Sequence, residues 1–349
     1  MKKINLMIVF GGKSSEHSVS IWSAENIINT IDKSKYILSL IYIDKKGNWY
    51  KLPNNFKIEE KEINANLKKF SNVCLCLKDS KGHIFDLKNK TSKIVDVCFP
   101  IMHGLNGEDG AIQGLLQMHN IKCVGPSMLS SSINMDKDLS KKILKYFNIK
   151  VAEFVSFKKH EIKSWSFEKV KKTLGAPFCV KPANNGSSIG ISKVRNKDEY
   201  ILALKNAFQY DKKIIIEKCI FGREIECSLI GNTEVFASIP GEIIPEDNFY
   251  SYSRKYLKNN TTQLIIPADL LKKQVKQVQS FAISAYKALE CSGFSRVDMF
   301  LTKNGELYLN EINTIPGFTS ISMFPKLWEA SNLDQKKLIN LIIQLALKN

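Results

Sequence analysis

The stretch R-V-D-M-F-L-T-K-N-G-E-L-Y-L-N-E-I-N, from Arg296 to Asn313, decides how this chain is interpreted. Two short apolar segments flank Asn304-Gly305, and Asn-Gly in that setting is the strongest short-range signal of a β-hairpin. A two-residue turn there would pair Asp298 with Glu311 and Arg296 with Asn313, all on one face of the hairpin. Directly opposed carboxylates repel each other unless something positive lies between them.

A divalent cation would hold these acidic side chains together. Asp298 and Glu311 supply hard oxygen ligands, and Asn313 adds a carbonyl oxygen two residues further along the same strand face. Magnesium keeps waters and phosphate oxygens in its shell, so we expect a nucleotide nearby. The alternative is an ordinary ion pair between Arg296 and a carboxylate, and the hairpin alone does not decide between the two.

A second stretch, F-C-V-K-P-A-N-N-G-S-S-I-G-I from Phe178 to Ile191, predicts a phosphate-binding loop. Lys181 ends an apolar strand, and the small and hydroxylated residues after it form a turn whose backbone N–H groups could hold phosphate. The loop fits neither the P-loop pattern nor the dinucleotide-binding G-x-G-x-x-G pattern. Asn-Asn-Gly-Ser-Ser is also a common loop composition, so the loop alone is a moderate signal.

The stretch I-I-I-E-K-C-I-F-G-R-E, from Ile214 to Glu224, predicts an apolar strand that ends at Glu217-Lys218. Such a strand end can present backbone amides to an adenine and a carboxylate to a ribose. The alternative is a strand that leaves the core with its charges in solvent.

Composition excludes several classes of protein. The chain has 349 residues, which suits two or three domains, and no apolar run approaches the roughly 20 residues of a membrane span. The net charge is +17, but only four of the 51 basic residues are arginine and the lysines are dispersed. We therefore expect a general compositional bias, with no nucleic-acid partner and no membrane partner. Eight cysteines without a C-x-x-C pair indicate reduced thiols in the cytoplasm.

The pattern of strands and helices predicts three domains of an α/β protein. Residues 1–125 alternate strands and helices, as in a parallel sheet covered by helices, with a lysine-rich insertion at residues 45–93 on the edge of the sheet. We expect a central domain at residues 126–220 and a C-terminal domain at residues 221–349, the latter ending in a helix that starts near Asp334.

These motifs together resemble the ATP-grasp superfamily, and within it the D-alanine–D-alanine ligases of bacterial cell-wall synthesis. The resemblance spans nearly the whole chain. Besides the stretches above, it includes G-G-K-S-S-E-H-S-V-S from Gly11, H-G-L-N-G-E-D-G from His103, M-D-K-D from Met135, F-Y-S-Y-S-R-K-Y from Phe249 and N-E-I-N-T-I-P-G-F-T-S from Asn310. So many matches in order make the resemblance specific.

The resemblance implies an ATP-grasp fold, in which a parallel α/β domain precedes two antiparallel-sheet domains. It implies that ATP phosphorylates one D-alanine and that the amine of a second D-alanine attacks the acyl phosphate, which yields D-alanyl-D-alanine for peptidoglycan. It further implies two Mg²⁺ or Mn²⁺ ions per active site and a homodimer. Some relatives join D-alanine to D-serine or D-lactate. Tyr256 favours D-alanine over D-lactate, because lactate-joining relatives typically lose that tyrosine.

The resemblance also assigns roles to individual residues. ATP would be bound by Lys137, Lys181, Glu217, Lys218, Ile220, Glu224 and Lys255, and the metal ions by Asp298, Glu311 and Asn313. Glu16 would grip the ammonium group of the first substrate, with Ser187 and Tyr256 bonded to it. Arg296 and the backbone N–H of Gly317 would stabilise the tetrahedral oxyanion. His103, Ser322 and Met323 would lie at the second substrate.

Two nearby acids receive a structural interpretation. Glu108 and Asp109 precede a helix predicted at residues 111–119, and acidic residues at that position interact favourably with the helix dipole.

Outside enzymes, the chain could be an inactive nucleotide-binding regulator or a basic nucleic-acid binder. A regulator would be expected to lose one of Asp298, Glu311, Arg296 or Lys181, and all four are present.

Overall fold

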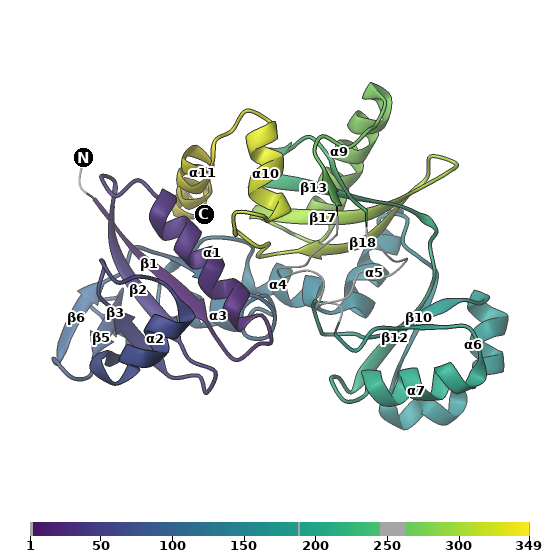
Figure 1. Cartoon of the computed structure of the whole chain (residues 1–349), viewed down its shortest axis with the longest axis horizontal. Coiled ribbons are helices and arrows are strands. Elements are labelled where there is room, and N and C mark those ends of the chain that lie inside the picture. The colour runs from purple at the N-terminus through teal and green to yellow at the C-terminus, as the bar shows by residue number, and fades with distance from the viewer. Residues whose placement is uncertain (1–2, 188, 245–262, 349) are drawn as a thin grey trace.

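The computed structural model describes residues 3–187, 189–244 and 263–348, and it contains three sheets (Figure 1). The first has eight strands in the order β6-β5-β4-β3-β2-β1-β7-β8. Its parallel part consists of β1 (Ile4–Gly11), β2 (Tyr36–Ile43), β7 (Val97–Ile101) and β8 (Lys122–Cys123). Helices α1 (His17–Thr30) and α3 (Ala111–Met118) belong to this part of the chain.

Residues 45–93 form most of the other half of that sheet. Strands β3 (Trp49–Leu52), β4 (Ser71–Lys78), β5 (Lys81–Asp86) and β6 (Thr91–Ile94) continue it outward from β2 as antiparallel pairs. The helix α2 (Glu60–Asn66) lies between β3 and β4 in the chain. The predicted insertion therefore extends the first sheet by four strands beyond β2.

The second sheet is antiparallel and has four strands in the order β11-β10-β12-β9. They are β9 (Phe154–Lys158), β10 (Phe178–Pro182), β11 (Ser192–Val194) and β12 (Lys213–Lys218), and helices α6 (Phe167–Leu174) and α7 (Lys197–Ala207) accompany them. Two helices precede this sheet in the chain, α4 (Met128–Met135) and α5 (Lys137–Tyr146).

The third sheet is also antiparallel, with the order β16-β15-β13-β17-β18 and β14 paired to β13. Its strands are β13 (Gly222–Gly231), β14 (Val235–Ala237), β15 (Gly241–Ile244), β16 (Gln263–Ile265), β17 (Gly293–Thr302) and β18 (Leu307–Asn313). The helices in this part of the chain are α9 (Lys272–Ala288), α10 (Met323–Ala330) and α11 (Gln335–Lys348). An α/β domain followed by antiparallel sheets is the predicted fold class, which is thereby confirmed.

The hairpin of β17 and β18 has the predicted residue pairs at the end that carries Asp298 and Glu311, but its turn differs from the predicted one. Asp298 lies opposite Glu311, and Arg296 lies opposite Asn313. The two-residue turn was wrong, because Thr302 and Glu306 close a three-residue loop, with Gly305 at φ +78°. A β-bulge restores the register, since Asn310 is the extra residue between the Asp298–Glu311 and Met299–Leu309 pairs.

Core packing explains the bulge. A regular two-residue hairpin would place Asn310 opposite Met299 on the buried face and turn Leu309 toward the polar face. In the structure Leu309 is 1% exposed and packs with Met299, while Asn310 is partly exposed. Burial of the leucine therefore selects the longer turn together with the bulge.

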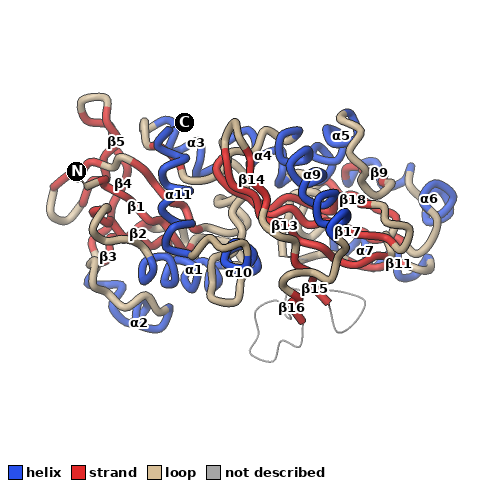
Figure 2. Tube along the Cα trace, turned by 90° about the horizontal axis from the view of Figure 1, so that it is seen from above, coloured by secondary structure: helices blue, strands red, loops and turns tan. Residues whose placement is uncertain are grey.

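The C-terminal helix α11 packs against the first sheet (Figure 2). Its residues Leu338, Ile339, Ile342 and Ile343 are fully buried in the core that also holds Leu6, Ile8 and Phe99 of the first sheet. The two predicted domain boundaries stay predictions, but this core joins the two ends of the chain. No helix in the described ranges is long and apolar enough to span a membrane.

Candidate active site

Each of the two opposed carboxylates has a cation beside it. Arg296 donates two hydrogen bonds of 2.7 Å to Asp298 and lies 2.9 Å from the carboxylate of Glu226 on β13. Glu311 lies 3.3 Å from the ammonium group of Lys137. The ion pair that was the alternative interpretation of Arg296 is therefore present, and Glu226 is a third acid of the cluster.

The same face carries a donor set suited to magnesium. The side-chain N–H of Asn313 donates a 2.8 Å hydrogen bond to Asp298 Oδ2, so the amide lies directly beside that carboxylate. Turning the amide over would present its oxygen there in place of its nitrogen. Among the described residues no three His, Cys, Asp or Glu side chains form a group that could hold a metal ion by themselves, and a magnesium site here would combine Asp298, Glu311 and the amide of Asn313. Two carboxylates and an amide oxygen match the hard-oxygen preference of the ion.

A buried ion network lies at the end of the second sheet. Lys181 on β10 bonds Glu217 on β12 at 2.7 Å, and Lys141 on α5 lies 3.2 Å from the other oxygen of the same carboxylate. Burial alone would raise the pKa of Glu217, but Lys141 and Lys181 lower it to about 2. Burial would likewise lower the pKa of Lys181, and Glu217 raises it. The carboxylate of Glu217 therefore faces two lysines, whereas the sequence motif suggested a role toward a ribose.

Lys137 connects the phosphate loop to the hairpin. Its ammonium group donates a 2.7 Å hydrogen bond to the carbonyl oxygen of Asn185, in addition to its contact with Glu311. Its backbone N–H donates to the carbonyl of Ala183 at 2.9 Å. A single cation thus touches both segments that the sequence assigned to phosphate and metal.

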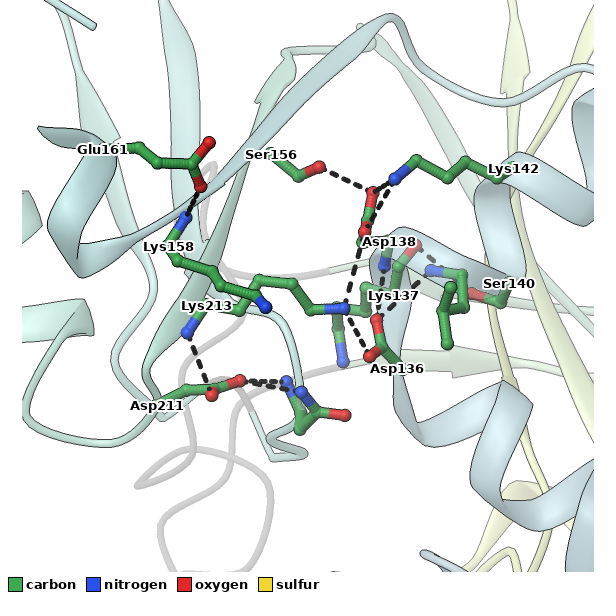
Figure 3. A network of polar contacts seen from close by, with 12 residues as sticks. Asp136, Lys137, Asp138, Ser140, Lys142, Ser156, Lys158, Glu161, Asp211 and Lys213 are labelled. Carbon is green, nitrogen blue, oxygen red and sulfur yellow. Dashed lines mark hydrogen bonds and ion pairs between the residues drawn. The ribbon is translucent and has the colours of Figure 1, made fainter. Parts of the chain in front are cut away.

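The aspartates of M-D-K-D explain why Lys137 is held there (Figure 3). Asp136 caps α5 by accepting hydrogen bonds from the N–H groups of Asp138 and Leu139, and it also pairs with Lys213 of β12. Asp138 accepts a 2.6 Å hydrogen bond from Ser156 of β9. The start of α5 is therefore fixed to two strands of the second sheet, which sets the direction of Lys137.

Glu16 is 8% exposed and precedes α1, as expected for a residue at the mouth of the first sheet. Its carboxylate lies beside two glycines, since a Cβ atom on Gly104 would come within 3.2 Å of its Oε2 and one on Gly186 within 3.6 Å. Gly186 belongs to the predicted phosphate loop. Loop and acid are thus neighbours, and Ser187, at φ +56°, follows directly.

Glu108 has a different role from the one expected. Its carboxylate accepts hydrogen bonds from the N–H groups of Gly104 at 2.7 Å and Ile315 at 3.3 Å, so it joins two loops and does not stabilise α3. Asp109 does lie at the start of α3 and accepts from the N–H of Ala111 at 3.0 Å. Burial raises the pKa of Glu108 to about 8, and the Glu16 carboxylate adds to the rise.

His103 is buried, and both ring nitrogens have partners. Nδ1 lies 2.9 Å from the carbonyl oxygen of Ile315, and Nε2 lies 3.2 Å from the hydroxyl of Ser23. That hydroxyl accepts from the N–H of Phe318 at 3.1 Å. Burial lowers the pKa of His103 and thereby favours the neutral form of the ring. These contacts hold the loop that carries Gly317 against the first sheet.

The remaining second-substrate residues lie at the start of α10. The hydroxyl oxygen of Ser322 accepts a 3.0 Å hydrogen bond from the N–H of Thr319, and a Cβ on Gly317 would come within 2.8 Å of that oxygen. Met323 is 4% exposed and packs with Ile243. Its side chain is therefore part of the core.

The other predicted ATP residues are spread along one end of the second and third sheets. Lys218 is exposed and Ile220 is half-buried beyond β12, while Glu224 on β13 pairs with Phe300 of β17, two positions before Glu226. Tyr256 and Lys255 lie outside the residues that the structure describes.

Sequence reasoning missed Lys141, Glu226 and the loop contacts of Glu108. Lys141 is one helical turn after Lys137, but nothing distinguishes it from the many other lysines of the chain. Glu226 lies two residues after Glu224 on one strand, and the alternation of side chains could have placed it on the same face.

Known proteins resemble this chain over nearly its whole length. A family model described as the N-terminus of D-ala D-ala ligase matches residues 5–126, and one described as the C-terminus matches residues 143–344. A D-alanine–D-alanine ligase from Clostridium acetobutylicum is 47% identical over 351 residues, covering 99% of this chain and 98% of that protein.

Two solved structures also match over nearly the full length. The D-alanine-D-alanine ligase from Coxiella burnetii has a TM-score of 0.89 and 36% identity, and the match covers 100% of this chain and 95% of that one. The VanG D-Ala:D-Ser ligase from Enterococcus faecalis has a TM-score of 0.89 and 34% identity, and the match covers 99% of this chain and 100% of that one.

Proposed function

Because this chain belongs to the D-alanine–D-alanine ligase family, whose members have the ATP-grasp fold, we propose that the residues between its second and third sheets bind ATP and those facing the first sheet bind D-alanine. The chain is an ATP-dependent ligase that joins two D-alanines through a D-alanyl phosphate. One observation carries the assignment of the site. Lys137 contacts both the phosphate loop and the carboxylate of Glu311, so a triphosphate at this cation would touch both sheets.

The charges suit the formation of an acyl phosphate. A carboxylate and a γ-phosphate repel each other, so cations must surround the position where they meet. Lys137 and Lys181 supply two of these cations, and Lys255 of the undescribed segment is proposed as a third. Held by Asp298, Glu311 and Asn313, two Mg²⁺ or Mn²⁺ ions would neutralise phosphate charge. Positioning of the two reactants then supplies much of the remaining acceleration.

The substrate residues come from all three parts of the chain: Glu16 precedes α1 beside the first sheet, Ser187 belongs to the phosphate loop, and Arg296 lies on β17. We assign the ammonium group of the first D-alanine to Glu16, with Ser187 and Tyr256 beside it. Arg296 and the N–H of Gly317 stabilise the oxyanion that forms when the second amine attacks. The N–H groups at the start of α10, with the hydroxyl of Ser322, are assigned to the carboxylate of the second D-alanine. His103 holds this loop in place, because both of its ring nitrogens are already bonded.

The adenosine end is assigned to the strand end after β12. Lys218 and Ile220 offer backbone groups to the adenine, and Glu224 offers a carboxylate to the ribose. Glu217 acts at the phosphate end of the site, because its carboxylate holds Lys181.

One assay tests this function. Purified protein is supplied with ATP, Mg²⁺ and D-alanine, and phosphate release is followed together with the mass of the product. We expect ADP, phosphate and D-alanyl-D-alanine. Parallel reactions with D-serine or D-lactate as the second substrate test the alternative acceptors, of which D-serine is the more relevant because of the similarity to VanG. A mixed dipeptide with D-serine, or a depsipeptide with D-lactate, as the main product at equal concentrations would contradict the preference for D-alanine.

A homodimer and a cytoplasmic location are further proposals that rest on the family and on the use of ATP. Light scattering after size-exclusion chromatography tests the first, and fractionation of cells tests the second.

A further inference from the structure

Lys141 is a fully buried lysine that no ligand assignment includes. Its side chain is 2% exposed, and its ammonium group lies 3.2 Å from Glu217 Oε1 and 3.0 Å from the carbonyl oxygen of Asn310. Burial lowers the pKa of Lys141, and Glu217 opposes that shift. A buried ammonium group costs stability unless it is paired, so a lysine at this buried position suggests a specific role.

The first reason is the charge balance around Lys181. Glu217 bonds Lys181 at 2.7 Å and would by itself cancel the positive charge of that lysine. The ammonium group of Lys141 lies 3.2 Å from the other oxygen of the same carboxylate. The group of Lys141, Glu217 and Lys181 therefore carries a net positive charge, and that charge is available to an anion next to Lys181.

The second reason is the bulge of the hairpin. Asn310 is the extra residue of that bulge and directly precedes Glu311. A bulge disrupts the ladder locally, so its backbone groups need other partners. Lys141 donates to the Asn310 carbonyl and so fixes the backbone that presents Glu311 opposite Asp298.

We propose that Lys141 is a positioning residue for phosphoryl transfer: it neutralises Glu217 so that the charge of Lys181 acts on the phosphates of ATP, and it anchors the bulge that carries Glu311. The proposal rests on the proposed function of the site. Because the side chain of Lys141 is buried against Glu217 and Asn310, its effect is transmitted through these two residues.

The test is a pair of variants. Lys141→Met keeps a long side chain without its charge, and we expect kcat/KM for ATP to fall about 100-fold, since Glu217 then neutralises Lys181. In the double variant with Lys141→Met and Glu217→Gln, the charge of Lys181 is no longer cancelled. We expect this double variant to recover at least tenfold relative to the single variant. A purely structural role for Lys141 would leave the double variant as poor as the single one or worse.

Lys142→Met is the matched control, because Lys142 is the next residue of α5 and its exposed side chain pairs with Asp138 at 2.9 Å. We expect its ATP kinetics to stay within about twofold of wild type. Thermal unfolding of all variants separates loss of fold from loss of charge balance.

The outcomes are distinct. Wild-type kinetics for Lys141→Met, or a folded double variant without recovery, would overturn the proposal. If Lys141→Met does not fold, the double variant decides: at least a tenth of the wild-type kcat/KM for ATP supports the proposal, and a lower value overturns it. Absence of D-alanine-dependent phosphate release by the wild-type protein would instead overturn the proposed function.

Discussion

Glu108 is an acid whose surroundings oppose its ionisation. Its carboxyl group joins the Gly104 and Ile315 loops, and burial raises its pKa to about 8 with a further contribution from Glu16. An unfolded chain would ionise it near pH 4.3. The native state therefore binds one more proton than the unfolded state between these values. The stability contributed by the protonated form is fully present below about pH 4.3 and is lost as the pH rises toward about 8.

Glu108→Gln should remove this pH dependence. We expect the free energy of unfolding of the wild type, relative to the variant, to fall by on the order of 2–4 kcal/mol between pH 5 and pH 8.5. Urea unfolding of both proteins at several pH values measures the difference. Parallel curves for the two proteins would contradict the raised pKa of Glu108.

Glu311 tests the metal assignment. We expect Glu311→Gln to lower turnover by about 1,000-fold or more with the fold intact, because the substitution removes the negative charge of one metal ligand and of the ion-pair partner of Lys137. The concentration of Mg²⁺ needed for half-maximal activity should rise, and removal of the metal by a chelator should abolish activity in the wild type. The measurement is phosphate release during a Mg²⁺ titration.

Glu306→Gln is the control on the same hairpin, since Glu306 pairs with the exposed Lys150 at 2.6 Å. Its turnover should stay near the wild-type value. If Glu311→Gln released phosphate as fast as this control, Glu311 would not be a metal ligand.

The residues of the site also differ in how well the sequence predicts them. The resemblance named Lys137 and Lys181 because they lie in recognisable motifs. Lys141 and Glu226 lie at ordinary positions, and their importance depends on partners far away in the sequence, such as Asn310 and Arg296. Pairings between distant segments of this kind follow from the tertiary fold, which local patterns do not specify.

At the scale of elements, the hairpin of β17 and β18 contains two deviations from the simplest geometry that offset each other. The three-residue loop shifts the register by one, and the bulge at Asn310 shifts it back. The Asn-Gly signal therefore predicted the Asp298–Glu311 pair correctly from a turn that was wrong. The alternation of Leu307 and Leu309 with polar residues determines the register at this end of the hairpin, because both leucines must face the core.

Gly305→Ala tests the turn. Gly305 has φ +78°, a region unfavourable for residues with a Cβ, while no atom lies within 4 Å of the position where that Cβ would be. The cost is therefore backbone strain alone, and we expect the free energy of unfolding to fall by about 1 kcal/mol. Lys303→Ala in the same loop should change it by less than about 0.5 kcal/mol. Equal effects of the two substitutions would argue against the three-residue loop with Gly305 in the left-handed region.

At the scale of the whole molecule, the first sheet and the C-terminal residues share one core. Phe318 follows Gly317 and is fully buried, with ring centroids 5.9 Å from Phe99 of β7 and 5.2 Å from Phe324 of α10. The loop proposed to hold the oxyanion is thus anchored in the packing between two ends of the chain. The sequence predicted a terminal helix, but an amphipathic pattern shows only that one face is buried and not which sheet buries it.

Ile342→Ala tests this shared core. Ile342 is fully buried in α11 among side chains of the first sheet, so removing most of its side chain should lower the free energy of unfolding by about 2–5 kcal/mol. Leu341→Ala, one residue earlier and 38% exposed, should cost less than about 1 kcal/mol. Because the same core holds Phe318, the Ile342 variant should also lose apparent affinity for D-alanine before it unfolds, which kinetics at rising temperature can detect. If α11 were a separate unit, the Ile342 variant would show an early transition confined to the helix while the D-alanine kinetics stayed unchanged up to the main transition.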